Sequence, residues 1–162
     1  MGPKAMLRMA SFASGAQRQT FQLGTSAQTS QHFQVLIVED DDAAAALLVA
    51  LFESHYPEVR CTLATDGLDA VLQLERMRPQ LLITDLIMEP FDGFRLLNMV
   101  NSRAEYRGIA TVALSGLDPS EIDKRGGLPP GVLFLTKPLN MDRLRGFIDA
   151  QVQFHRQLRA TA

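Results

Sequence analysis

Short apolar blocks that alternate with helix-like patterns constrain the fold of this chain more than any other feature. Two of them, VLIV (35–38) and LLIT (81–84), are continuously apolar or nearly so, which is typical of strands covered on both faces. VRCTLA (59–64) alternates apolar with polar residues, and this favours an edge strand. The two remaining blocks are IATVAL (109–114) and VLFLT (132–136).

Segments with helical periodicity separate these five predicted strands. AAAALLVALFES (43–54) forms a helix for which Asp41 or Asp42 can serve as the N-cap. The next helix follows Asp66 and cannot continue past Arg78, because Pro79 comes next.

The second half of the chain has three further helical patterns. One helix begins near Gly93, where the preceding Asp92 suits a turn or an N-cap. PSEIDKR (119–125) offers at most a short helix with Ile122 as its one apolar anchor. The last helix ends near Leu158 and has an apolar stripe made of Leu144, Phe147, Ile148 and Val152.

Five strands that alternate with helices imply parallel pairing through right-handed crossovers. We therefore predict an α/β fold with a doubly wound, five-stranded parallel sheet and helices on both faces. The flavodoxin-like strand order, 2-1-3-4-5, places the alternating strand 59–64 at an edge, as its pattern requires.

Length and composition limit the functional classes. A chain of 162 residues is long enough for one well-buried core and too short for two ordinary domains. A net charge of -2 gives no electrostatic reason to expect nucleic acid or an anionic membrane as the partner. Cys61 is the only cysteine, which excludes an internal disulfide and fits a reducing, cytoplasmic location. No apolar run approaches the roughly 18 residues that a membrane helix needs.

The first 33 residues differ in composition from the rest. They are rich in Gln, Ser, Thr, Ala and Gly, and no acidic residue occurs before Glu39. We expect residues 1–33 to be a flexible extension and residues 34–158 to form the functional domain.

Polar side chains stand where the predicted strands end. Glu39 and Asp40 follow the first strand, and Asp85 follows the third. Ser115 ends the fourth strand, and Lys137 follows the fifth. In a parallel sheet these ends lie along one edge, where the strand order reverses and a ligand crevice opens.

Such a cluster predicts a cation site with phosphoryl chemistry. Three neighbouring carboxylates repel one another unless a cation compensates them. A set of oxygen ligands without histidine or thiolate favours Mg²⁺. With Lys137 and Ser115 as donors beside it, the arrangement suits the transfer of a phosphoryl group to one carboxylate.

Four segments together resemble the signatures of the response-regulator receiver domains of two-component signalling. They are VLIVEDD, LLITDLIMEPFDG, ALSG and FLTKP. The resemblance covers residues 34 to about 155, and its spacing is specific: 30 residues from Asp85 to Ser115 and 22 from Ser115 to Lys137.

By motif position, the resemblance implies that Asp85 is the phosphoacceptor. It implies that Asp40 ligates Mg²⁺ directly, that Glu39 acts through water, and that the backbone carbonyl of Ile87 is a further ligand. No other cofactor is implied.

The resemblance also assigns roles around the phosphoryl group. Ser115 and Lys137 are expected to bind its oxygens, and the Lys137–Pro138 peptide is expected to be cis. Phe134, three residues before Lys137, matches the aromatic switch position, where it would respond together with Ser115.

The implied function is signal transfer rather than enzymatic turnover. A histidine kinase or a histidine phosphotransfer protein would supply the phosphate, and a downstream protein would read the modified domain. A weak homodimer through the fourth helix, fifth strand and last helix stays open. So does the choice between a stand-alone protein, which the four residues after Leu158 favour, and a receiver cut from a hybrid kinase.

This sequence departs from the family pattern near the acceptor. Met88 is followed by Glu89, and Pro90 comes one place later than usual. Ile87 and Leu117 stand where the family's hydrolytic water approaches, and neither can orient it by hydrogen bonding. We therefore predict slow self-dephosphorylation.

Two other functions compete with this interpretation. One is a pseudo-receiver that only binds proteins and is never phosphorylated. The other is a Mg²⁺-dependent aspartyl phosphohydrolase, which usually needs a carboxylate two residues after its nucleophile, where this chain has Ile87. His155 is expected on the exposed side of the last helix and is not expected to donate phosphate.

Overall fold

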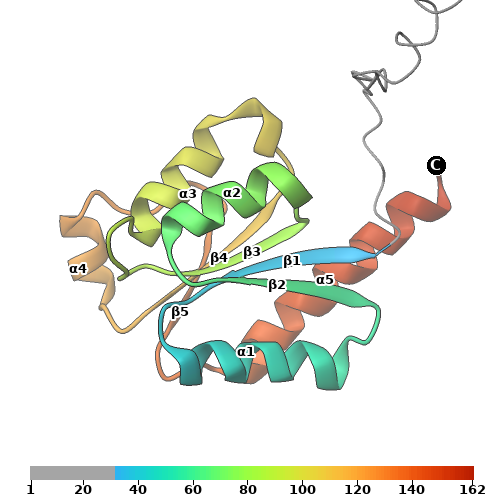
Figure 1. Ribbon diagram of the computed structural model, residues 1–162, viewed down its shortest axis with the longest axis horizontal. Helices are drawn as coiled ribbons and strands as arrows, with labels where there is room; N and C mark the ends of the chain where they lie inside the picture. Colours follow the sequence, from blue (N-terminus) through green and yellow to red (C-terminus); the bar gives the residue numbers. More distant parts are fainter. Residues whose placement is uncertain (1–31) are drawn as a thin grey trace, which may run out of the picture.

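The computed structural model describes residues 32–162 and shows a single parallel sheet between two layers of helices (Figure 1). The strand order is β2-β1-β3-β4-β5, and every neighbouring pair is parallel. The strands are β1 (Phe33–Val38), β2 (Val59–Ala64), β3 (Leu81–Asp85), β4 (Ala110–Ser115) and β5 (Leu133–Thr136). The predicted flavodoxin-like fold is confirmed.

Helices cover both faces of the sheet. On one face, α1 and α5 bury their apolar stripes against odd-numbered positions of β1 and β3. On the other face, α2, α3 and α4 pack against the even-numbered positions. The helices are α1 (Asp42–His55), α2 (Gly67–Met77), α3 (Gly93–Ser102), α4 (Pro119–Lys124) and α5 (Met141–Ala160), and a short 3-10 turn, η2 (Ala104–Tyr106), precedes β4.

Acidic N-caps fix where four of these helices begin: Asp41 for α1, Asp66 for α2, Asp92 for α3 and Asp118 for α4. The side chain of Asp41 accepts a hydrogen bond from the backbone N–H of Ala44, and Asp92 does the same for Arg95. Asp118 forms a reciprocal capping box with Glu121 at the start of α4. Because each cap contributes about 1 kcal/mol, these residues set the directions in which the chain leaves the carboxyl ends of the strands.

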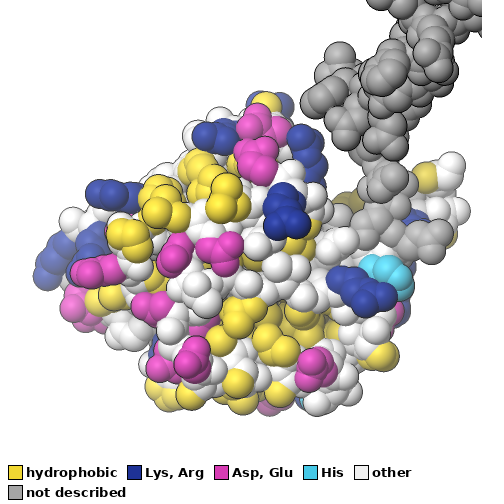
Figure 2. Space-filling model, viewed as in Figure 1, with side chains coloured by type: hydrophobic (Ala, Val, Ile, Leu, Met, Phe, Trp, Pro, Cys, Tyr) yellow, Lys and Arg dark blue, Asp and Glu magenta, His cyan; other side chains and the backbone are white. Residues whose placement is uncertain are grey.

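Strand β2 forms an exposed edge of the sheet, as its alternating sequence predicts. Leu63 of β2 is exposed together with Leu47 of α1 and with Leu68 and Leu72 of α2. Figure 2 shows the apolar side chains of this side of the molecule. The central strand β3, in contrast, is buried along its whole length.

The prediction that His155 is exposed is wrong. Helix α5 continues to Ala160 and crosses the start of β1, so the His155 ring is half-buried and meets Phe33 edge-on, with 5.4 Å between the ring centroids. This burial lowers the pKa of His155.

The predicted N-terminal extension and the predicted lack of a membrane helix concern single segments of the chain. Residues 1–31, which include nearly all of the predicted extension, lie outside the described residues. Between residues 32 and 162, no helix is long and apolar enough to span a membrane.

Candidate functional site

The carboxyl ends of four strands bring the predicted site residues to one edge of the sheet. Strand β1 leads directly into Glu39 and Asp40, and β3 ends at Asp85. On the other side of β3, Ser115 ends β4, and Lys137 follows β5. Val38 pairs with Thr84, Asp85 with Leu114 and Ser115 with Thr136, so these strands end within a residue or so of one another and bring their terminal side chains to the same edge.

Three carboxylates form the acidic part of this edge. One oxygen each from Glu39, Asp40 and Asp85 lie within 4.8 Å of one another. Glu39 is 1% exposed and Asp85 is 8% exposed, whereas Asp40 faces solvent. Between residues 32 and 162 this is the one group of acidic, histidine or cysteine side chains close enough to hold a metal ion. Its all-oxygen donor set fits a hard divalent cation such as Mg²⁺.

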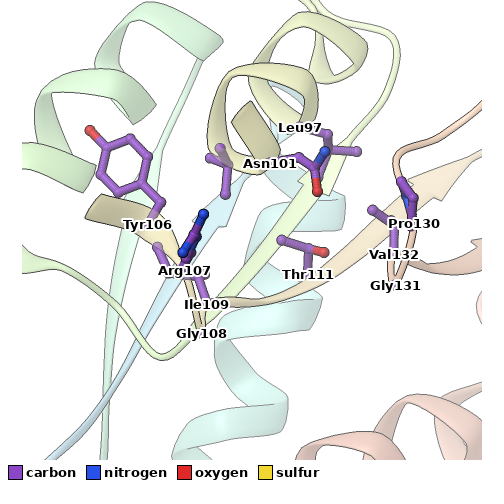
Figure 3. Close-up of a pocket in the computed structure, with 11 residues that line it drawn as sticks. Leu97, Asn101, Tyr106, Arg107, Gly108, Ile109, Thr111, Pro130, Gly131 and Val132 are labelled. Atoms are coloured by element: carbon purple, nitrogen blue, oxygen red, sulfur yellow. The ribbon is translucent and has the colours of Figure 1, made fainter. Parts of the chain in front are cut away.

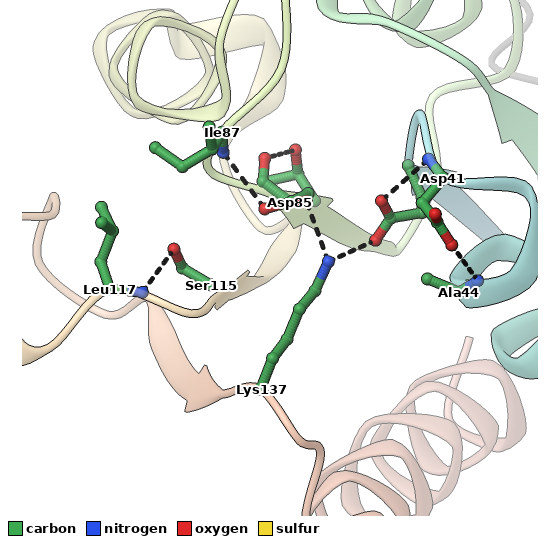
Figure 4. Close-up of polar contacts among 9 residues, drawn as sticks. Asp41, Ala44, Asp85, Ile87, Ser115, Leu117 and Lys137 are labelled. Atoms are coloured by element: carbon green, nitrogen blue, oxygen red, sulfur yellow. Dashed lines mark hydrogen bonds and ion pairs between the residues drawn. The ribbon is translucent and has the colours of Figure 1, made fainter.

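The ammonium group of Lys137 bridges two of these carboxylates. Its Nζ atom donates to Oε2 of Glu39 and to Oδ2 of Asp85, at 2.9 Å in both cases (Figure 4). Burial lowers the pKa of Lys137, but the hydrogen bonds to Asp85 and Glu39 outweigh burial and raise it above its ordinary value. Lys137 therefore stays charged and offsets part of the repulsion among the three acids.

Burial controls the protonation of Glu39. It raises the pKa of this carboxyl, against the hydrogen bonds from Lys137 and from the backbone N–H of Asp41, which lower it. Burial thus favours the neutral form of the Glu39 carboxyl, because water cannot reach it.

Backbone contacts hold Asp85 in place. Its Oδ1 atom accepts a hydrogen bond of 3.1 Å from the backbone N–H of Ile87, and its carbonyl accepts one of 2.8 Å from the hydroxyl of Thr84. Gly93 packs so closely below that a Cβ atom there would lie 2.1 Å from the Asp85 carbonyl oxygen. Asp85 is therefore oriented by the loop that follows it and by the first residue of α3.

The loop after Asp85 contains Pro90, one place later than in the family pattern. The Glu89–Pro90 peptide is cis. The prediction of a cis Lys137–Pro138 peptide is also confirmed.

Ser115 and Phe134 lie beside the acidic cluster rather than within it. Ser115 is fully buried, and its Oγ atom accepts a hydrogen bond of 3.1 Å from the backbone N–H of Leu117 (Figure 4). Phe134 is half-buried against the core on the α2–α3–α4 face. Among the described residues, no hydrogen bond joins the Ser115 hydroxyl to Asp85.

Two features of the site do not follow from the strand-end pattern. One is that Glu39, rather than the exposed Asp40, shares Lys137 with Asp85. The other is the close approach of Gly93 to the Asp85 carbonyl. The sequence gives only a weak signal for this close approach. Gly93 stands directly after the N-cap Asp92, at a helix position that usually tolerates a larger residue.

Comparison with protein families gives one match that spans most of the chain. Residues 35–149 match the family described as "Response regulator receiver domain". PilG of Pseudomonas aeruginosa is 24% identical over 127 residues, which are 77% of this chain and 91% of PilG. PilH of the same organism is 29% identical, over 72% of this chain and 95% of PilH.

Solved structures with the same architecture agree with this match. The signal receiver domain of a DNA binding response regulator from Colwellia psychrerythraea 34H is 28% identical, with a TM-score of 0.65 over 75% of this chain and 98% of that domain. The chemotaxis response regulator CheY4 of Vibrio cholerae, at 20% identity, shares the fold with a TM-score of 0.62 over 74% of this chain and 98% of its own.

Proposed function

The chain belongs to the response regulator receiver domains of two-component signalling, and from this premise we propose that it accepts a phosphoryl group from a phosphohistidine onto Asp85. Proteins of this family are signalling modules rather than classical enzymes. The observation that carries the proposal is the convergence of Lys137 and three carboxylates at the one acidic cluster of residues 32–162. The donor is a histidine kinase or a histidine phosphotransfer protein.

The proposed transfer forms one bond and breaks another. An oxygen of the Asp85 carboxylate attacks phosphorus, the bond from phosphorus to the donor imidazole nitrogen breaks, and an acyl phosphate results. The imidazole leaves with the electron pair and takes a proton from water. Asp85 can attack because the Ile87 N–H fixes one of its oxygens while the other lies against Lys137.

Lys137 stabilises the charge that shifts toward Asp85 during transfer. Its ammonium group already touches Oδ2 of Asp85, so it can contact the incoming phosphoryl oxygens with a short displacement. The second contact, with Glu39, keeps the ammonium at the sheet edge while it changes partner. Such prepositioned charge lowers the barrier because little reorganisation is needed in the reaction itself.

The acidic cluster fits the divalent cation that the family generally binds. We propose that Asp40, Asp85 and the backbone carbonyl of Ile87 would hold Mg²⁺, with Glu39 acting through water. When bound, Mg²⁺ supplies positive charge that offsets both the carboxylate repulsion and the phosphoryl charge. The protein's part is to gather these oxygens, which it does on two neighbouring strands, β1 and β3.

Phosphorylation is proposed to change a protein-binding surface. The hydroxyl of Ser115, which accepts from the Leu117 N–H, would move and donate to a phosphoryl oxygen, and Phe134 would turn into the space that Ser115 leaves. The adjacent helix α4 has six residues and a single buried one, Ile122, so moving it costs few contacts. The downstream protein would read the face formed by α4, β5 and α5.

The test is exposure to acetyl phosphate and Mg²⁺, followed by intact mass measurement. We expect a single phosphate adduct that is absent in Asp85→Asn and when the metal is chelated. Asp41→Asn is the matched control, because it removes a neighbouring carboxylate while asparagine still caps α1. Absence of any adduct would instead support a pseudo-receiver, and repeated turnover of a phosphoester would support an aspartyl phosphohydrolase.

A further inference from the structure

The shortness of α4 leaves part of the sheet uncovered. Its six residues rise about 9 Å, whereas the six residues of β4 span about 20 Å. After α4 the chain continues as a loop to β5, and three glycines in that loop have positive φ: Gly126, Gly127 and Gly131. A longer helix in this place would cover the amino ends of β4 and β5 on the α3 face.

A cavity of about 260 Å³ lies in this uncovered place. It is bordered by the end of α3, by the start of β4 and by the loop before β5 (Figure 3). We name it the amino-end pocket. Because its strand residues precede or begin β4 and β5, it lies at the opposite end of those strands from Ser115 and Lys137.

The floor of the amino-end pocket is apolar. Leu97 and Val100 of α3 are buried, while Ile109 and Val132 are half-buried. Figure 3 shows Val132 and Pro130 on one side of the hollow and Leu97 above it. Only Ile109, Pro130 and Val132 leave apolar surface in the cavity, which is room for one small hydrocarbon or aromatic group beside the polar side chains.

Three polar side chains stand around this floor: Asn101, Arg107 and Thr111. Figure 3 shows Asn101 reaching down from α3 toward Thr111 on β4, and Arg107 rising toward α3. Among residues 32–162, none of the three side chains forms a hydrogen bond or an ion pair. The other polar group nearby, the hydroxyl of Tyr106, is already bound to Glu75.

The charge of the amino-end pocket selects the ligand. Arg107 is the one charged residue of the lining, and no carboxylate is among the residues that border the cavity. A guanidinium binds a carboxylate through two parallel hydrogen bonds, and the amide of Asn101 and the hydroxyl of Thr111 are further donors. The volume, just below the range of drug-sized pockets, limits the ligand to a small molecule.

We propose that the amino-end pocket binds a small carboxylic acid that carries an apolar or aromatic group. The carboxylate pairs with Arg107 and accepts from Asn101 or Thr111, and the apolar group lies against Ile109, Pro130 and Val132. The acidic cluster takes no part in this contact, so the contact does not require the carboxylate of Asp85.

Benzoate is the probe for the test, titrated into the full chain while backbone amide resonances are recorded by NMR. We expect saturable shifts confined to the residues that border the cavity. Arg107→Gln should weaken binding about tenfold or more, because a charge-assisted contact is lost. Thr111→Val, which keeps the shape of the side chain, should weaken it less. Arg143→Gln, an exposed arginine on α5, is the matched control and should bind as the unaltered chain does.

A second probe separates carboxylate recognition from simple filling of an apolar hollow. Benzamide has the same ring without the charge, and we expect it to bind at least tenfold more weakly than benzoate. Equal binding of the two probes, binding unaffected by Arg107→Gln, or no saturable shift at all would each overturn the proposal. Asp85→Asn should bind benzoate as the unaltered chain does. Failure of benzoate binding can therefore be distinguished from failure of phosphorylation.

Discussion

The Nζ atom of Lys137 lies 2.9 Å from Oδ2 of Asp85, although the two residues are 52 positions apart in the chain. The same atom lies 2.9 Å from Oε2 of Glu39, a residue 98 positions away. One ammonium group thus ties the loop after β5 to the ends of β1 and β3, across the intervening β4. This contact links the stability of the fold to the chemistry of the site.

Replacing Lys137 by methionine is expected to destabilise the protein by about 2 kcal/mol in the absence of metal. The side chain of Glu39 is fully buried, so it loses its cationic partner without gaining water. The partial exposure of Lys137 keeps the loss below that of a fully buried pair. Urea unfolding measures the change, with Lys124→Met at the exposed end of α4 as the control. An unchanged unfolding midpoint would show that the bridge contributes nothing.

The close packing below Asp85 predicts that Gly93→Ala destabilises the protein by about 3 kcal/mol. The new Cβ atom would lie 2.1 Å from the Asp85 carbonyl oxygen and 2.8 Å from the Cα of Leu86, both backbone atoms that cannot turn away. Because α3 must shift, the rate of adduct formation on Asp85 should fall as well. Thermal unfolding and the acetyl phosphate assay measure the two effects.

Gly146→Ala is the matched control for that substitution. Gly146 lies exposed within α5, and a Cβ atom there meets nothing within 4 Å. Alanine favours a helix over glycine by about 1 kcal/mol, so this variant should be more stable than the unaltered chain. If both substitutions changed stability equally, the close contact of Gly93 would not be the cause.

The single cysteine should react slowly in the folded protein. Burial, with a smaller effect of Glu53, raises the pKa of Cys61 to about 12. Relative to the ordinary value of 9.0, the thiolate fraction at neutral pH falls about a thousandfold. A thiol pKa raised by folding stabilises the fold below pH 9 and loses that contribution as the pH rises toward 12.

Alkylation with iodoacetamide tests this prediction for Cys61. The rate in the native protein should rise about tenfold per pH unit from pH 8 to pH 10 without levelling, since the thiolate stays the minor species. In the protein unfolded by urea, the alkylation rate should stop rising once the pH passes the ordinary pKa of a thiol. A native rate that levels near pH 9 would contradict the burial of this side chain.

Much of the fold could be predicted because the hydrophobic pattern of each strand depends on whether one or both of its faces are buried. The continuous apolar runs of 35–38 and 81–84 became β1 and β3, with a strand on either side, and the alternating run 59–64 became the edge strand β2. The position of His155 could not be predicted, since its burial depends on α5 passing over Phe33, a contact between the two ends of the described chain.

The candidate site could be predicted only as a set of neighbours. Because parallel strands end on one side, the positions of Glu39, Asp85 and Lys137 indicate that they meet. Which carboxylate shares the ammonium depends on side-chain direction: Glu39 turns inward and Asp40 outward. The only sequence feature that indicated the amino-end pocket was the short helix at 119–125. A cavity forms where no segment covers the sheet, and no residue pattern marks such a place.

The side chains around Asp85 predict that the phosphorylated protein loses its phosphate slowly. Ile87, whose N–H bonds to Asp85, is 45% exposed, and Leu117, whose N–H bonds to Ser115, is half-buried; neither side chain can hydrogen-bond to an attacking water. After the phosphodonor is removed, the adduct should persist for minutes or longer with Mg²⁺ present, as followed by intact mass. Ile87→Asn should shorten this lifetime about tenfold, since an amide can orient water, whereas Leu72→Asn, on exposed α2, should not. A lifetime of seconds in the unaltered chain would mean that another group activates the water.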